Sequence, residues 1–187
     1  MSNHGAFGFF FFFEGKGVAS VLLGSVVALN QPSIDLTNVI TNSFNKYMID
    51  LLDVYPTTDN VKLLLLFSNS NGQSWITSAQ YGYTYYTVYS SPFSGISTNN
   101  GTATSIELTS EQGNQTNEKI NGTLELRNPN SNTYKHLGIN LSSISQQPYY
   151  KITIGAGFSR DASPIKAVRM YFSSGNIYGK VSVYGIN

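Results

Sequence analysis

The chain has 187 residues and a formal net charge of +1, with only 11% charged and 13% aromatic residues. This length suits one domain with its own hydrophobic core, and the few scattered basic residues argue against nucleic-acid binding through phosphate neutralisation. The absence of cysteine excludes disulfides, Cys-ligated zinc and thiol catalysis.

Five consecutive phenylalanines, Phe9, Phe10, Phe11, Phe12 and Phe13, lie near the start of the chain. In an extended conformation their rings alternate between two faces, so both faces are apolar. Full burial of the five contributes on the order of 10 kcal/mol, whereas exposure invites aggregation. Two interpretations stay open: an inner strand of the protein's own fold, or an arm buried by a neighbouring chain. Flanking glycines supply flexible joints, so we favour the arm and interpret the run as an assembly interface.

The next apolar segment, residues 18–29, has the length of a signal-peptide core and follows Lys16. Ser20 and Gly24 interrupt it, and the phenylalanine run precedes the basic residue, which is the wrong order for such a signal. A membrane span needs about 20 apolar residues, and residues 14–17 separate the two apolar runs. We therefore expect neither a secretion signal nor a membrane span.

Short apolar and aromatic runs then recur between clusters of Asn, Ser, Gly and Pro. The expected strands are residues 61–68, 80–90, 102–108, 119–127, 149–158, 163–173 and 177–186, and the expected loops are 91–101, 110–117 and 128–132. Residues 38–52 come nearest to a helix, but their β-branched and aromatic content favours a strand or irregular chain. This spacing predicts an all-β sandwich.

Glycine and asparagine mark the expected turns. Asn71-Gly72 follows an apolar run and is a hairpin signal. Gly175 and Asn176 tolerate positive φ between the last two expected strands, and Gly179 marks a bulge or a close backbone approach. The chain ends on an apolar strand, which must be pinned in a sheet or between chains.

Catalytic and metal-binding motifs are missing from the sequence. The only histidines are His4 and His136, and no nucleophile-elbow, zinc-protease or P-loop spacing occurs. Asp50, Asp53 and Asp59 flank a turn, where we interpret them as solvated residues, with a calcium site as the minor alternative. We expect no catalytic residue, cofactor or metal, and hence no enzyme.

Tyr81, Tyr83, Tyr85 and Tyr89 share one face of the expected strand 80–90, and Trp75 lies in the loop before it. Aromatic platforms bind sugar rings, so these residues are candidates for glycan contact. Tyrosine also packs well in sheets and at subunit interfaces while its hydroxyl contacts water. Both interpretations stay open, and we favour packing.

Two segments resemble a pattern in tailed-phage structural proteins. Residues 34–75, IDLTNVITNSFNKYMIDLLDVYPTTDNVKLLLLFSNSNGQSW, are similar to a segment in which ID(F/L) and spaced tyrosines lead to a TD…L.L.FS…G..W motif. Residues 163–187, SPIKAVRMYFSSGNIYGKVSVYGIN, resemble the closing FSSGNI..G…(L/V)YGI motif, which forms the last hairpin of that module.

The resemblance implies a single jelly-roll-like antiparallel β-sandwich over residues 34–187, preceded by an assembly arm or first strands over 1–33. It implies a virion location and a homotrimer that contacts major capsid or tail proteins. We expect a capsid decoration or cement protein that stabilises the particle through contacts between subunits. The alternative is a receptor-binding tail-fibre or tailspike domain that recognises host surface polysaccharide.

Overall fold

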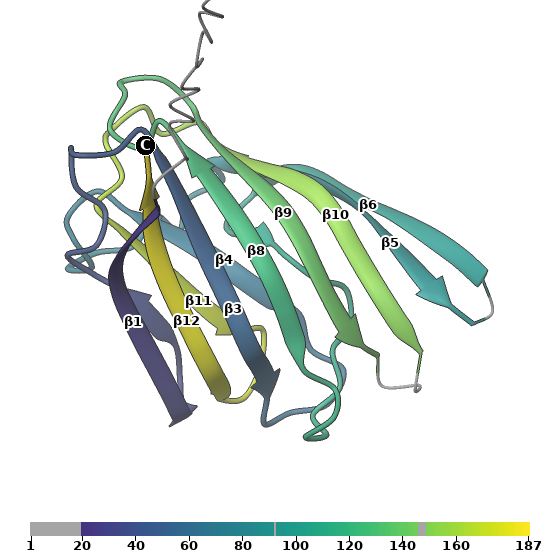
Figure 1. Cartoon of the computed structure of the whole chain (residues 1–187). Helices are drawn as coiled ribbons and strands as arrows, with labels where there is room; N and C mark the ends of the chain where they lie inside the picture. Colours follow the sequence, from purple (N-terminus) through teal and green to yellow (C-terminus); the bar gives the residue numbers. More distant parts are fainter. Residues whose placement is uncertain (1–19, 92, 146–148) are drawn as a thin grey trace, which may run out of the picture.

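The computed structural model describes residues 20–91, 93–145 and 149–187, which form two antiparallel sheets packed face to face (Figure 1). The strands are β1 (Ser20–Gln31), β2 (Ile34–Leu36), β3 (Lys46–Pro56), β4 (Leu63–Ser68), β5 (Tyr81–Ser90), β6 (Phe93–Ala103), β7 (Ile106–Glu107), β8 (Ile120–Arg127), β9 (Lys135–Ile144), β10 (Tyr150–Ser159), β11 (Ala167–Phe172) and β12 (Ile177–Ile186). No helix occurs in these residues. The expected all-β antiparallel sandwich is confirmed, while the five phenylalanines lie outside the described residues.

The two sheets are unequal. The large sheet has the strand order β1-β12-β3-β8-β9-β10-β5-β6, and the small sheet has the order β2-β11-β4-β7. In Figure 1 the large sheet runs from β1 on the left to β6 on the right, with the small sheet behind it. β2 contacts β1 and β12, whereas β7 contacts β5 and β10. Residues 94–97 of β6 are exposed on both faces, so the end of the large sheet extends beyond its cover.

The core lies between the sheets because alternate side chains of each strand point inward. On β3 the inward residues Tyr47, Ile49 and Leu51 are buried. The small sheet meets them with the inward residues of β11, among which Val168 and Met170 are buried. The inward faces of the two sheets therefore form one shared apolar core.

The predicted hairpin at Asn71-Gly72 is wrong, although its local geometry is confirmed. Asn71 has φ 55° and Gly72 has φ 87°, as the sequence indicated. However, β4 before the turn pairs with β11 and β7, while β5 after it pairs with β10 and β6 in the other sheet. Two positive φ angles reverse the chain locally, but they do not decide which sheet the next strand joins.

The same correction applies to the last expected hairpin. The turn between β11 and β12 contains Gly175 at φ 77°, yet its two strands belong to different sheets. Gly179 confirms the predicted close approach and bulge: its φ is 124°, a Cβ there would lie 2.6 Å from the Val54 Cα, and the β12–β3 register shifts beside it. β12 lies between β1 and β3, which confirms that the closing strand is pinned in a sheet.

Several strands differ from the sequence prediction. The expected loop 91–101 is wrong, because most of it belongs to β6, whose polar residues are held by backbone pairing with β5. β9 was not predicted, although its inward Leu137, Ile139 and Leu141 alternate with small or polar residues. The segment that we compared with a signal peptide forms β1 from Ser20 onward.

We predict that Leu65→Ala lowers the free energy of unfolding by about 2–5 kcal/mol, because it leaves a cavity in the core. Leu65 of β4 is fully buried, whereas its neighbour Leu64 is only half-buried. Leu64→Ala is therefore the matched control, with an expected loss below about 2 kcal/mol. Urea unfolding followed by the fluorescence of Trp75, the single tryptophan, measures both. Equal losses would contradict the assigned inward face of β4.

Candidate functional site

The strongest candidate site is the outer face at the β1 end of the large sheet. β1 pairs with β12 on one side, and in the part of the chain that the structure describes its other edge carries no strand. Four of its apolar side chains are exposed, and two of them strongly: Val27 is 60% and Leu29 is 71% exposed. A long edge strand with exposed apolar side chains is a template for pairing with another chain.

A hollow of about 260 Å³ lies on this face between β1, β12 and β3. Its apolar lining, which we call the β1 patch, consists of Val27, Leu29, Leu52, Tyr55 and Tyr178. The Tyr55 and Tyr178 rings stack at 5.0 Å between centroids and line the hollow side by side. An apolar hollow with charged residues at its rim has the composition of a protein-binding surface.

Irregular backbone on adjacent strands shapes the β1 patch. The β3–β8 register shifts between Leu51 and Val54, where Asp53 adopts φ 54°. The Asp53 N–H donates to Asn121 Oδ1 at 2.9 Å, and the Asp53 carboxylate accepts from Lys119 Nζ at 2.8 Å. This hydrogen bond lowers the pKa of the Asp53 carboxyl. Leu52 faces outward into the hollow by the regular alternation of β3, and the bulge after it turns Val54 back into the core.

The predicted assembly interface, Phe9–Phe13, lies outside the described residues, but its tether is short. Residues 14–19 are all that separate it from Ser20, the first residue of β1. Seven peptide steps reach on the order of 25 Å at full extension.

The four tyrosines that the sequence places on one face, which we call the tyrosine ladder, all lie on β5: Tyr81, Tyr83, Tyr85 and Tyr89. This face of β5 points into the sandwich. Tyr81 and Tyr85 are buried, and Tyr83 and Tyr89 are partly buried. The Tyr81 hydroxyl accepts from the Phe67 N–H at 2.8 Å, and burial raises the pKa of the Tyr81 phenol. Since Tyr81 and Tyr85 present no open ring face, the ladder serves packing between the sheets in this structure.

The buried carboxylate of Glu107 on β7 binds two tyrosines of the ladder, Tyr83 and Tyr85. Its carboxylate accepts from the Tyr83 hydroxyl at 3.1 Å, from the Tyr85 hydroxyl and from Lys62 Nζ at 3.0 Å. Burial, with the neighbouring Glu107 carboxylate, raises the pKa of Tyr83 to about 12. This cluster joins β5 of the large sheet to β4 and β7 of the small sheet.

Trp75, the other predicted contact residue, packs against the core from the loop after β4. The Arg169 guanidinium carbon lies 4.4 Å from the centroid of its ring. Arg169 also donates two hydrogen bonds to the Asp35 carboxylate, at 2.7 and 2.6 Å. The outer face of the tryptophan is thus covered by a held cation, which fits a structural role.

Two buried lysines fasten loops to the large sheet. Lys135 Nζ donates to the backbone oxygens of Ser131 and Ala162, at 2.5 and 3.2 Å. Lys151 Nζ donates to the backbone oxygens of the loop after β7. Burial lowers the pKa of both ammonium groups, that of Lys151 to about 8. Sequence reasoning missed both residues, because a lysine in an alternating strand gives no sign of which face is inward.

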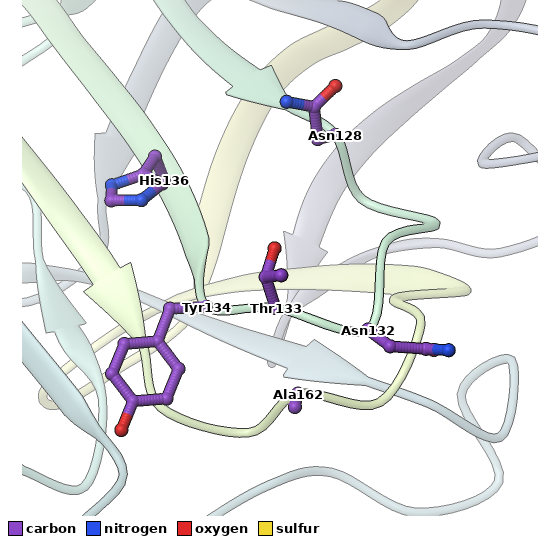
Figure 2. Close-up of a pocket in the computed structure, with 6 residues that line it drawn as sticks. All are labelled: Asn128, Asn132, Thr133, Tyr134, His136 and Ala162. Atoms are coloured by element: carbon purple, nitrogen blue, oxygen red, sulfur yellow. The ribbon is translucent and has the colours of Figure 1, made fainter.

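A second hollow, of about 540 Å³, lies where the loop between β8 and β9 meets the loop after β10. Figure 2 shows its lining, which consists of Asn128, Asn132, Thr133, Tyr134, His136 and Ala162. Tyr134 and His136 are exposed, and no carboxylate lines the hollow. Lys135 holds both loops from below. The site offers amide, hydroxyl and imidazole groups and one phenol ring, which suits a polar ligand.

No group of three or more His, Asp or Glu side chains in the described residues is placed to hold a metal ion. None of the elements in this part of the chain is a helix of sufficient length and apolar character to cross a membrane. Comparison with known proteins found no matching family model, no similar curated protein and no similar solved structure. The function must therefore be argued from the surfaces described above.

We predict that the free energy of unfolding rises between about pH 8 and pH 9.5. Lys151 has a pKa of about 8 in the folded chain, against about 10.4 for an unfolded lysine. In this window the unfolded chain binds more protons, so stability rises by up to about 1.4 kcal/mol per pH unit. Above about pH 10 the trend reverses, since unfolded tyrosines ionise there while Tyr83 keeps its proton to about 12.

Urea titrations at several pH values, on the wild type and on Lys151→Met, measure this effect. The substitution removes the titrating group, so the rise between about pH 8 and pH 9.5 should be lost in the variant. Groups elsewhere titrate equally in both proteins and cancel in the difference. A wild-type stability that stays flat over this window would contradict the buried position of the ammonium group.

Proposed function

We propose that this protein is a structural component of a tailed-phage virion, specifically a capsid decoration or cement protein. The observation that carries the proposal is the β1 patch, an apolar hollow beside a strand whose outer edge is paired with no other strand among the described residues. The resemblance of residues 34–75 and 163–187 to phage structural modules supports the virion location. In this proposal the protein works by association, and no bond is made or broken.

The proposed mechanism is the burial of the β1 patch against a capsid or tail protein. Val27, Leu29 and Leu52 are each half or more exposed. Covering an aliphatic side chain of this kind contributes about 1–2 kcal/mol. The free edge of β1 adds backbone hydrogen bonds to a strand of the partner.

We predict that purified virions of the phage that encodes this chain contain the wild-type chain at a fixed ratio to the major capsid protein. The double variant Val27→Asp/Leu29→Asp should be at least about 10-fold depleted, because each carboxylate would have to be buried without a partner. Both side chains are exposed, so the isolated variant should keep its fold. Quantitative mass spectrometry of the particles measures the ratio.

Asn69→Asp is the matched control, because it adds a charge at an exposed position of the turn after β4. Its amount in particles should equal that of the wild type. Absence of the wild-type chain from particles would overturn the virion proposal. Normal incorporation of the double variant would overturn the role of the β1 patch alone.

A second candidate function is recognition of host surface polysaccharide, and the polar hollow of Figure 2 is the observation that favours it. Its asparagine, hydroxyl and imidazole groups can bond sugar hydroxyls, and Tyr134 can stack on a sugar face. Specific signals on a glycan array that disappear with Tyr134→Ala and persist with Tyr83→Ala would support it. A blank array would exclude this use of the hollow for the glycans tested.

A further inference from the structure

On β10 the apolar side chains point outward and the polar ones point toward the core, which is the reverse of the neighbouring central strands β8 and β9. The residues that it turns toward the core are Lys151, Thr153, Gly155, Gly157 and Ser159, which are polar or lack a side chain. The residues that it turns outward are Tyr150, Ile152, Ile154, Ala156 and Phe158. Tyr150 is 71% and Ile154 is 60% exposed. The apolar side of this strand therefore faces away from the protein's own core.

Close packing keeps β10 in this orientation. A Cβ at Gly157 would lie 2.8 Å from the Ile106 side chain, and one at Gly155 would collide with the backbone of β5. A shift of one residue would turn Ile154 and Ala156 toward this space, which has no room for them. The close packing around the inward glycines Gly155 and Gly157 therefore fixes which side of β10 faces outward.

The apolar face continues onto β5, where two aromatic rings lie flat on neighbouring strands. Tyr86, which is exposed, extends over Gly95 of β6, and Phe158 extends over Gly82 of β5. In both cases a side chain at the glycine would overlap the ring. We call the resulting surface the β10 face, and it consists of Tyr86, Val88, Tyr150, Ile152, Ile154 and Phe158. It is flat, aromatic and aliphatic.

Charged side chains are missing from the outward positions of β9, β10, β5 and β6 that surround the β10 face. On β9 the outward residues are His136, Gly138, Asn140 and Ser142, and on β6 they are Gly95, Ser97 and Asn99. The nearest cation is Arg160, whose guanidinium carbon lies 5.1 Å from the Phe158 ring centroid at the end of the strand. An uncharged face meets its own copy without like-charge repulsion, and loss of charge is typical of interface centres.

The size of the β10 face also fits a contact between copies. β10 has ten residues, and the β10 face together with the uncharged outward positions of β9 and β6 beside it spans four adjacent strands. Spacings of about 3.3 Å per residue and about 4.8 Å between strands give on the order of 500 Å² in flat projection. Side-chain relief increases this value, so it approaches the 600–1,000 Å² or so that each partner contributes to a specific interface.

We propose that the β10 face packs against the β10 face of a second copy of this chain and holds the copies together. The proposal rests on the assembly function proposed above and identifies one of its partners. It assigns separate tasks to two surfaces: the β10 face joins identical copies, and the β1 patch contacts a different protein. A surface that packs against the same surface of a second copy is related to it by a twofold axis, so this contact joins copies in pairs.

The test is sedimentation equilibrium of the full chain, as wild type and as Ile154→Asp. The wild type should have a multiple of the 20.5 kDa chain mass, and the variant should associate at least about 100-fold more weakly. Ile154→Thr, which keeps β-propensity but removes apolar surface, should weaken association less. Val27→Asp/Leu29→Asp is the matched control and should keep the wild-type mass. Circular dichroism verifies that each variant is folded.

A wild-type chain that stays monomeric would overturn the β10 contact, as would an oligomer that survives Ile154→Asp. A Tyr86-dependent glycan signal on a monomeric chain would assign the face to sugar and would also overturn it. These results are independent of particle composition. A chain that is found in particles but is monomeric in solution would overturn the β10 contact and leave the virion proposal standing. An oligomer that is absent from particles would overturn the virion proposal and leave the β10 contact standing.

Discussion

The four-stranded sheet has to cover the inner face of an eight-stranded sheet, and the rest of the structure depends on this difference in width. Around β3 the two sheets meet through aliphatic side chains. Toward β5 the small sheet narrows to the two residues of β7, and the chemistry of the buried face changes. There Tyr83 and Tyr85 reach Glu107, and Lys151 binds backbone oxygens. Polar groups can be buried at low cost only when they have such partners.

The outer face of the large sheet is divided by charge. Lys46 of β3 pairs with Glu125 of β8 at 2.6 Å, and Arg127 of β8 contacts the same carboxylate. The β1 patch lies on one side of these ion pairs, and the β10 face lies on the other. These pairs lie near the start of β3, while Lys119 pairs with Asp53 at 2.8 Å beside the β1 patch. Solvated ion pairs contribute little stability, but they stay hydrated and keep two apolar surfaces from merging into one. A single sheet can therefore present two separate contact surfaces.

Alternation and turn chemistry predicted what is local, and they failed where the answer depended on distant segments. They placed Tyr81, Tyr83, Tyr85 and Tyr89 on one face, and they identified the positive φ of Gly175 and the close approach at Gly179. They could not show that this face is inward, because a period of two defines two faces without naming the buried one. The Asn71-Gly72 turn was expected to close a hairpin, since sheet membership is decided by strands far away in the sequence. The β1 patch was missed because residues 18–29 were considered as a signal or membrane segment and as part of an arm or first strands over 1–33, and neither view showed which of their side chains face outward.

The position of β12 has a consequence for how the chain reaches its fold. Ser20 pairs with Ile186, so the first described strand finds its neighbour in the last described one. Contacts so distant in the sequence slow folding, because both strands must have been synthesised before the large sheet can close. Until then the apolar edge of β1 is open on both sides. The interval between synthesis and closure is therefore when this protein is most at risk of aggregation and most in need of a chaperone.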